Sequence, residues 1–169
     1  MGKRSNFERI ENDAYYSPYK AVAPLIPYLP PNTKFADLCA GNGGMARHIE
    51  KHGHSCIYQS DIDPQREGIE RRDYLFFGGD IPSADMYIMN PPWEREILHP
   101  TIELFRNLAP TWLLFDSDWM FTGQAKEYKK YCELIVTVGR ISWMGNGTAG
   151  KDNCCWYKFG KNKCDTILI

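Results

Sequence analysis

Short apolar runs alternate with segments of helix-like composition from residue 34 to about residue 131. Such alternation is the sequence pattern of βαβ units, in which parallel strands are connected by helices that cover the sheet. The pattern therefore predicts an α/β fold with a mostly parallel sheet and helices on both faces. In open sheets of this kind, functional groups lie in the loops that follow the carboxyl ends of the strands.

The bounds of the expected elements follow from apolar periodicity and from the positions of glycine and proline. Strands are expected over residues 34–39, 55–60, 74–77, 84–89 and 111–116, and helices over residues 45–52, 65–72, 95–108 and 124–131. Pro100 is expected to limit the regularity of the third helix. Further on, residues 134–141 and 154–159 are strand-like and flank a glycine-rich loop at 144–150. They predict an antiparallel hairpin at the sheet edge and a total of seven strands.

The chain has 169 residues, of which 43% are hydrophobic. This is enough for one well-buried core and too little for two ordinary domains, so we expect a single domain over residues 1–169. Residues 1–33 are rich in tyrosine and proline, which predicts a segment laid over that domain. No insertion is long enough for a separate target-recognition domain.

The formal net charge is −1, so the whole molecule offers no positive field to attract nucleic acid. Beyond residue 125, however, eight basic residues stand against four acidic ones. This segment is either an ordinary solvated face or a local patch for a polyanion. Its basic residues are Lys126, Lys129, Lys130, Arg140, Lys151, Lys158, Lys161 and Lys163.

The six cysteines form no Cys-x-x-Cys pair and have no accompanying histidine spacing of the zinc type. They predict free thiols and no metal site. The sequence has no apolar run near 18 residues and no apolar stretch at its start, so no membrane span or secretion signal is expected. A reducing cytoplasm is the expected location.

A glycine-rich turn follows the first expected strand, where Asp37 precedes Gly41 and Gly43. Glycines there let backbone approach a ligand closely, although a tight strand-to-helix turn alone has the same composition and the usual Gly-x-Gly-x-x-Gly fingerprint is absent. Asp61 ends the next strand, about 20 residues later, where a carboxylate can accept hydrogen bonds from ribose hydroxyls. Asp63 is the alternative for this role.

A second loop, Asn90-Pro91-Pro92-Trp93, directly follows the apolar strand that ends at residue 89. The Asn90 side-chain oxygen and the Pro91 carbonyl can together accept both hydrogens of an aromatic amino group, which frees its lone pair. Two prolines fix the backbone and supply no competing N–H, and Trp93 offers a face for stacking a planar substrate. The alternative is a purely structural turn.

These segments resemble the motifs of class I S-adenosylmethionine-dependent methyltransferases. Phe35-Ala36-Asp37-Leu38-Cys39-Ala40-Gly41-Asn42-Gly43-Gly44 resembles the first motif, Asp61-Ile62-Asp63-Pro64 the second, Arg72-Asp73-Tyr74-Leu75 the third, and Asn90-Pro91-Pro92-Trp93 the fourth, found in enzymes that act on planar nitrogen. Residues 13–18 resemble the N-terminal cofactor-covering motif of adenine methyltransferases. The resemblance spans residues 13–159 and implies a Rossmann-like fold that binds S-adenosylmethionine.

The resemblance also implies a role for each matching residue. Asp73 matches the carboxylate of the third motif, which in the family contacts the adenine amino group of the cofactor. The alternative is that Asp73 is an ordinary surface carboxylate. The implied catalytic residues are Asn90, Pro91, Pro92 and Trp93, and no histidine is required. The implied cofactor-binding residues are Tyr16, Ser17, Pro18, Asp37, Cys39, Ala40, Gly41, Gly43, Asp61, Ile62, Asp73, Tyr74 and Asn90.

The substrate follows less directly from the sequence. Asn90 at the first position favours adenine N6 or a glutamine amide, and Trp93 with the C-terminal positive charge favours nucleic acid, with DNA ahead of RNA. The final hairpin resembles that of small, phage-type DNA N6-adenine methyltransferases, and a homodimer is a further expectation. Trp143 and Trp156 are expected to pack in the core or at the edge. The alternatives are an RNA adenine methyltransferase, a protein glutamine methyltransferase, and a non-catalytic module that binds the cofactor.

Overall fold

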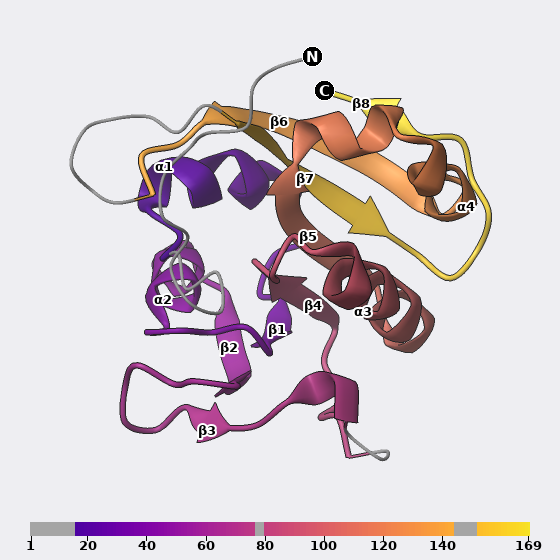
Figure 1. The fold of residues 1–169 in the computed structure, drawn as a ribbon. Coiled ribbons are helices and arrows are strands. Elements are labelled where there is room, and N and C mark those ends of the chain that lie inside the picture. The colour runs from indigo at the N-terminus through magenta and orange to yellow at the C-terminus, as the bar shows by residue number, and fades with distance from the viewer. Residues whose placement is uncertain (1–15, 77–79, 144–151) are drawn as a thin grey trace.

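A computed structural model of the chain describes residues 16–76, 80–143 and 152–169. Within them, eight strands form one sheet in the order β3-β2-β1-β4-β5-β7-β6-β8 (Figure 1). The strands are β1 Lys34–Asp37, β2 Ser55–Asp61, β3 Glu70–Arg71, β4 Met86–Met89, β5 Thr111–Asp116, β6 Cys132–Arg140, β7 Asn153–Phe159 and β8 Ile167–Leu168.

Strands β1 to β5 are parallel to one another, and β7 lies antiparallel between β5 and β6. The predicted α/β fold with a mostly parallel sheet and a C-terminal antiparallel hairpin is therefore confirmed. The described sheet has eight strands where the sequence predicted seven. The additional strand is β8, a two-residue strand that pairs in parallel with β6 at the edge. The expected hairpin loop at 144–150 lies outside the described residues.

The α-helices are α1 Tyr19–Val22, α2 Gly44–Glu50, α3 Arg95–Leu108 and α4 Lys126–Lys129. Short 3₁₀ helices are η2 Ala23–Tyr28, η3 Tyr74–Phe76, η4 Ser117–Phe121 and η5 Gly123–Ala125. Helix α3 runs through Pro100 without a break, and the Thr101 hydroxyl donates to the Ile97 carbonyl at 2.6 Å beside it. No helix in the described part of the chain is long and apolar enough to span a bilayer.

Alternate residues of the central strands bury themselves in two different cores. In β4, Tyr87 and Met89 pack with α3 and η4, whereas Met86 and Ile88 pack with α1, η2 and α2. All four residues are buried, which explains why the strand is a continuous apolar run in the sequence. The helices thus cover both faces of the sheet, as predicted (Figure 1).

The chain between β2 and β4 differs from the sequence prediction. Residues 65–72 do not form a helix, because the chain turns at Gly68, whose φ of 86° lies in the left-handed region. Residues 74–76 form η3 and not a strand, since the Asp73 carboxylate accepts from the Leu75 N–H at 2.9 Å and starts a turn. The third strand is instead the two-residue β3, which pairs with the end of β2.

The segment before β1 packs on the sheet face opposite α3. Ala21 and Leu25 are fully buried there, and the Trp156 indole N–H of β7 donates to the Ala21 carbonyl at 2.8 Å. This bond joins residues 135 positions apart in the sequence. The predicted packing role of Trp156 is therefore confirmed, since its side chain is fully buried.

Two buried tryptophans allow this bond to be measured. Trp156→Phe should lower the free energy of unfolding by about 0.5–1.5 kcal/mol more than Trp112→Phe does. Both side chains are fully buried, but the Trp112 N–H has no hydrogen-bond partner among the described residues. Urea denaturation of the two variants measures the difference. Equal losses would mean that the Ala21 bond contributes nothing to stability.

Candidate active site

A cavity of about 610 Å³ opens where the loops after β1, β2 and β4 meet. The chain passes from β1 outward to β2 and β3 and then returns to β4 on the other side of β1. Open α/β sheets bind ligands at such a switch point, outside the carboxyl ends of the strands. The cavity brings together the following predicted residues: Tyr16, Ser17, Cys39, Ala40, Gly41, Asp61, Ile62, Asp73, Tyr74, Asn90 and Pro92.

The remaining predicted residues lie outside the cavity lining. Pro18 is the N-cap of α1, and Gly43 is the N-cap of α2. Pro91 and Asp37 are buried. Trp93 is half-buried and meets the edge of Trp143, with ring centroids 6.0 Å apart and planes at 81°. The structure thus places Trp93 against another tryptophan at the sheet edge and not on the cavity wall.

The glycine turn after β1 needs its glycines for different reasons. Gly41 has φ of 53°, and the Tyr16 ring lies 3.6 Å from where its Cβ would be, so Tyr16 covers this turn. Gly43 has φ of 72°, and a Cβ there would meet the Arg66 guanidinium at 3.0 Å. Only Gly41 of these two lines the cavity. Gly43 is therefore required by the turn into α2 and by Arg66.

The structure distinguishes the two aspartates that end β2. The Asp61 carboxylate accepts from the Gly41 N–H at 2.7 Å and from the Asp63 N–H at 2.8 Å, which fixes it at the cavity. The Asp63 carboxylate pairs instead with Arg71 at 3.0 Å and accepts from the Gln65 side chain at 2.8 Å. Both line the cavity, but Asp61 is the one that the backbone of the glycine turn orients.

Asp37 lies at the end of β1 and is fully buried. One carboxylate oxygen accepts from the Cys39 N–H at 3.1 Å, and the other has no hydrogen-bond partner among the described residues. Burial is the main cause that raises the pKa of Asp37 to about 8; the Cys39 N–H hydrogen bond acts against it, and the nearby Asp61 charge adds to it. The carboxyl group is therefore mostly neutral at pH 7.

The cavity walls carry more negative than positive charge. Asp61, Asp63 and Asp73 line one side, and Glu94 and Glu96 at the start of α3 line the other. The lining contains a single basic side chain from the described residues, Arg72, which contacts Glu70 at 3.3 Å. Such a cavity suits a ligand with positive charge.

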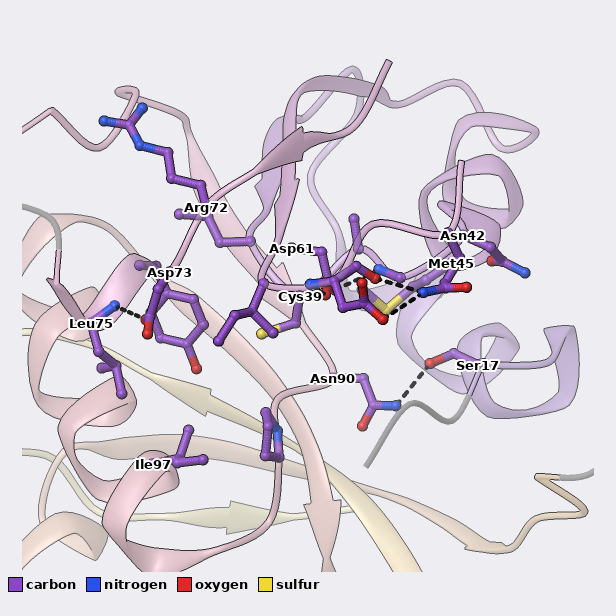
Figure 2. Close-up of a pocket in the computed structure, with 18 of the residues that line it drawn as sticks. Ser17, Cys39, Asn42, Met45, Asp61, Arg72, Asp73, Leu75, Asn90 and Ile97 are labelled. Atoms are coloured by element: carbon purple, nitrogen blue, oxygen red, sulfur yellow. Dashed lines mark hydrogen bonds between the residues drawn. The ribbon is translucent and has the colours of Figure 1, made fainter. Parts of the chain in front are cut away.

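Asn90 is the first residue after β4 and faces the same cavity as Asp61 (Figure 2). Its amide nitrogen donates to the Ser17 hydroxyl at 3.2 Å, and its amide oxygen accepts from the Trp93 indole N–H at 3.4 Å. Pro91 is buried while Pro92 lines the cavity, so the double proline turns the chain from the sheet into α3.

Several lining residues were not predicted from the sequence. Glu94, Glu96 and Ile97 begin α3, and a signal for them existed, since a helix that starts directly after the Asn90 loop must present its first turn to the cavity. Met45 lines the cavity from α2. Gln65 and Phe76 come from the irregular segments after β2 and β3, for which the sequence offers no comparable signal.

Among the C-terminal basic residues that the structure describes, none lines the cavity, and Lys151 lies outside the described residues. In β7, Cys154 lies opposite Asp116 at the carboxyl end of β5, while Lys158 lies opposite Trp112 near its amino end. Lys158 is also paired with Glu133 at 2.7 Å. The antiparallel register thus carries Lys158 and the residues after it to the edge of the sheet opposite Asn90. Arg140, at the end of β6 and opposite Asn153, lies at the same carboxyl edge of the sheet as Asn90.

The thiols have no assigned chemistry at this site. All six cysteines are free, and no group of three or more potential metal ligands is found in the described ranges. Cys39 lines the cavity, but burial and the neighbouring Asp37 raise the pKa of its thiol well above the ordinary value. The thiol therefore stays protonated at neutral pH and is a weak nucleophile.

Solved structures with the same fold include several methyltransferases. A protein described as a "putative RNA methyltransferase" from Pyrococcus horikoshii matches with a TM-score of 0.64 and 14% identity, over 95% of this chain and 92% of that one. A modification subunit of a type I restriction enzyme from Vibrio vulnificus matches at 0.63 and 13% identity, over 92% of this chain and 47% of that one.

A dimethyladenosine transferase from Plasmodium falciparum matches at 0.57 and 13% identity, over 86% of this chain and 61% of that one. Neither a protein-family model nor a curated protein sequence matches this chain. The identities are low, so these similarities establish the fold: a Rossmann-like α/β sheet shared with methyltransferases.

The buried Asp37 should make stability depend on pH. The folded-state pKa of Asp37, about 8, lies above its pKa in the unfolded chain. The contribution of Asp37 to the free energy of unfolding is therefore fully present below about pH 4. It is lost as the pH rises through about 8. The stability of the wild type relative to Asp37→Asn should therefore fall over this range, by at most about 1.4 kcal/mol per pH unit.

Denaturant titrations of both proteins between pH 4 and 9 measure this difference. The exposed Asp165→Asn serves as the control and should follow the wild type at every pH. A difference between wild type and Asp37→Asn that is the same at all pH values would contradict a raised pKa at Asp37.

Proposed function

We propose that the protein is an S-adenosylmethionine-dependent methyltransferase that transfers a methyl group to the N6 amino group of adenine in DNA. The proposal rests mainly on the position of Asn90. This residue directly follows β4 and lines an acidic cavity at the switch point of the sheet. Structures that share the fold include a type I restriction modification subunit and a dimethyladenosine transferase. The name of the second associates this fold with methylated adenosine.

The residues of the cavity fit S-adenosylmethionine. The cavity volume of about 610 Å³ is in the range of ligand pockets, and the acidic lining of the cavity matches a ligand with sulfonium and ammonium charges. In this proposal Asp61, which the Gly41 N–H holds at the cavity, accepts from ribose hydroxyls, and Asp73, which accepts from the Leu75 N–H, also accepts from the adenine amino group (Figure 2). When bound, this cofactor supplies an electrophilic methyl group.

Asn90 and Pro91 would prepare the substrate amino group. The lone pair of an aromatic amine is delocalised into the ring, which makes the nitrogen a poor nucleophile. Hydrogen bonds to the Asn90 side-chain oxygen and the Pro91 carbonyl would hold both amino hydrogens and localise the lone pair on nitrogen. These acceptors sit on a loop stiffened by two prolines, so little reorganisation is needed when charge develops.

RNA is the second candidate substrate. The match to the Pyrococcus horikoshii protein covers nearly the whole of both chains, whereas this chain spans about half of the restriction subunit. The experiment that tests the proposal incubates the protein with labelled S-adenosylmethionine and separate pools of duplex DNA, single-stranded DNA, RNA and protein. Label in N6-methyladenine of DNA is expected, and label only in glutamine or only in RNA would overturn the DNA assignment.

Asn90→Ala should abolish methyl transfer while the fold and the affinity for S-adenosylmethionine change little. Loss of a preorganised polar contact of this kind typically lowers kcat by about 10²–10³-fold. Single-turnover rates measure the effect, and calorimetry measures cofactor binding. The control is Asn107→Ala, an exposed asparagine of α3, which should retain the wild-type rate. A folded Asn90→Ala protein with the wild-type rate would overturn the mechanism.

Basic residues at the carboxyl edge of the sheet should contact the phosphates of the substrate. Arg95 at the start of α3 and Arg140 at the end of β6 are both exposed at the carboxyl edge of the sheet. Replacing each by alanine should weaken duplex binding and lower its salt dependence by about one unit of log–log slope. Lys161→Ala, beyond the opposite edge, is the matched control. If Lys161→Ala reduces the slope and Arg140→Ala does not, the nucleic acid lies on the other edge.

A further inference from the structure

Ser17 belongs to the N-terminal segment but contacts the loop that begins at Asn90. It lies two residues before α1, is 7% exposed and lines the cavity. The segment around it is anchored, because the Ala21 N–H donates to the Pro18 carbonyl at 2.9 Å and the Ala21 carbonyl accepts from Trp156. Ser17 is therefore held at a defined position relative to the sheet.

The hydroxyl of Ser17 contacts Asn90, 73 residues away, by accepting from its amide nitrogen at 3.2 Å (Figure 2). A half-turn of an asparagine amide exchanges its oxygen and its NH₂ group, which have nearly the same shape and opposite hydrogen-bonding character. The two orientations of Asn90 are thus not equivalent for function. With oxygen toward the substrate it accepts from an amino group, and with NH₂ toward the substrate it opposes one donor with another.

Two contacts select the same orientation. The Ser17 hydroxyl takes the amide nitrogen on one side, and the Trp93 indole N–H, which can only donate, takes the amide oxygen at 3.4 Å on the other. The Trp93 bond is the longer of the two and comes from the same loop, so it cannot fix Asn90 relative to the rest of the cavity. Ser17 belongs to a separately anchored segment and can.

We propose that Ser17 is a positioning residue whose hydroxyl fixes the Asn90 amide with its oxygen available to accept from the substrate amino group. The inference rests on the proposed methyl-transfer function. It predicts that the Ser17 hydroxyl acts on kcat through Asn90, with little effect on substrate affinity, because orientation of the acceptor matters most when the amine is activated.

The contact itself is tested without any reaction. In protein labelled with isotopic nitrogen at asparagine, Ser17→Ala should shift the side-chain amide signals of Asn90, identified by their absence in Asn90→Ala. The other asparagine signals should stay where they are. Ser17→Thr keeps a hydroxyl and should return the Asn90 signals close to their wild-type positions.

The consequence for catalysis is tested by kinetics. Ser17→Ala should lower kcat by roughly 10–100-fold, as expected for misplacement of a catalytic group. The KM for the nucleic-acid substrate should stay within about twofold of wild type. Ser17→Thr should restore most of the rate. The matched control is Thr33→Val, which removes another buried hydroxyl of the N-terminal segment, one that donates to the Pro30 carbonyl at 2.6 Å. Thr33→Val should lower the melting temperature and leave kcat unchanged.

The outcomes separate this inference from the proposed function. If the wild type methylates no substrate, the proposed function is wrong, and this inference falls with it even where the Asn90 signals shift. If an active enzyme shows unchanged Asn90 signals in Ser17→Ala, the contact is absent and the inference is overturned. It is also overturned if the signals shift but kcat does not, or if Thr33→Val lowers kcat as much as Ser17→Ala.

Discussion

Parallel pairing of β4 with β1 is the constraint on which the site depends. Phe35 lies opposite Met86 and Ala36 opposite Tyr87, so both strands end at the same edge of the sheet. The glycine turn after β1 and the Asn90 loop after β4 are thereby placed side by side, although about 50 residues separate them in the sequence. The four buried residues of β4 stand between Asp85 and Asn90, so a shift of register would move one of these polar side chains into the core.

The carboxylates of the site have different surroundings and therefore different roles. Asp37 lies in the core without enough partners and is kept neutral by burial, which costs less than burying an unpaired charge. Asp61 is oriented by backbone N–H groups and stays at the cavity wall, and Asp63 is engaged by Arg71. Three aspartates that look alike in the sequence are thus distinguished only by their hydrogen bonds and depth.

How much the sequence predicts depends on the range of the interaction. Strands 86–89 and 111–116 were predictable, because apolar runs followed by polar turns are local signals. The third strand was placed wrongly at 74–77, since a two-residue strand such as β3 has no pattern and the apolar composition of this segment outweighed the local turn that Asp73 starts. The sequence could not place the C-terminal basic residues relative to the site, because the antiparallel direction of β7 carries Lys158 to the amino end of β5. The contact of Ser17 with Asn90 joins segments too far apart for any local pattern.

The position of β7 has a consequence for the order in which the molecule can be completed. Among the described residues this strand is the seventh in sequence order, but it lies inside the sheet between β5 and β6, and its Trp156 holds the segment that carries Ser17. A ribosome-bound chain that ends before residue 153 lacks this strand. The edge of β5 is then unpaired, and the hydrogen bond from Trp156 to the Ala21 carbonyl of α1 has not yet formed. The Asn90 loop can therefore contact an anchored Ser17 only after β7 has been made and has joined the sheet, and the same step covers the apolar edge of β5.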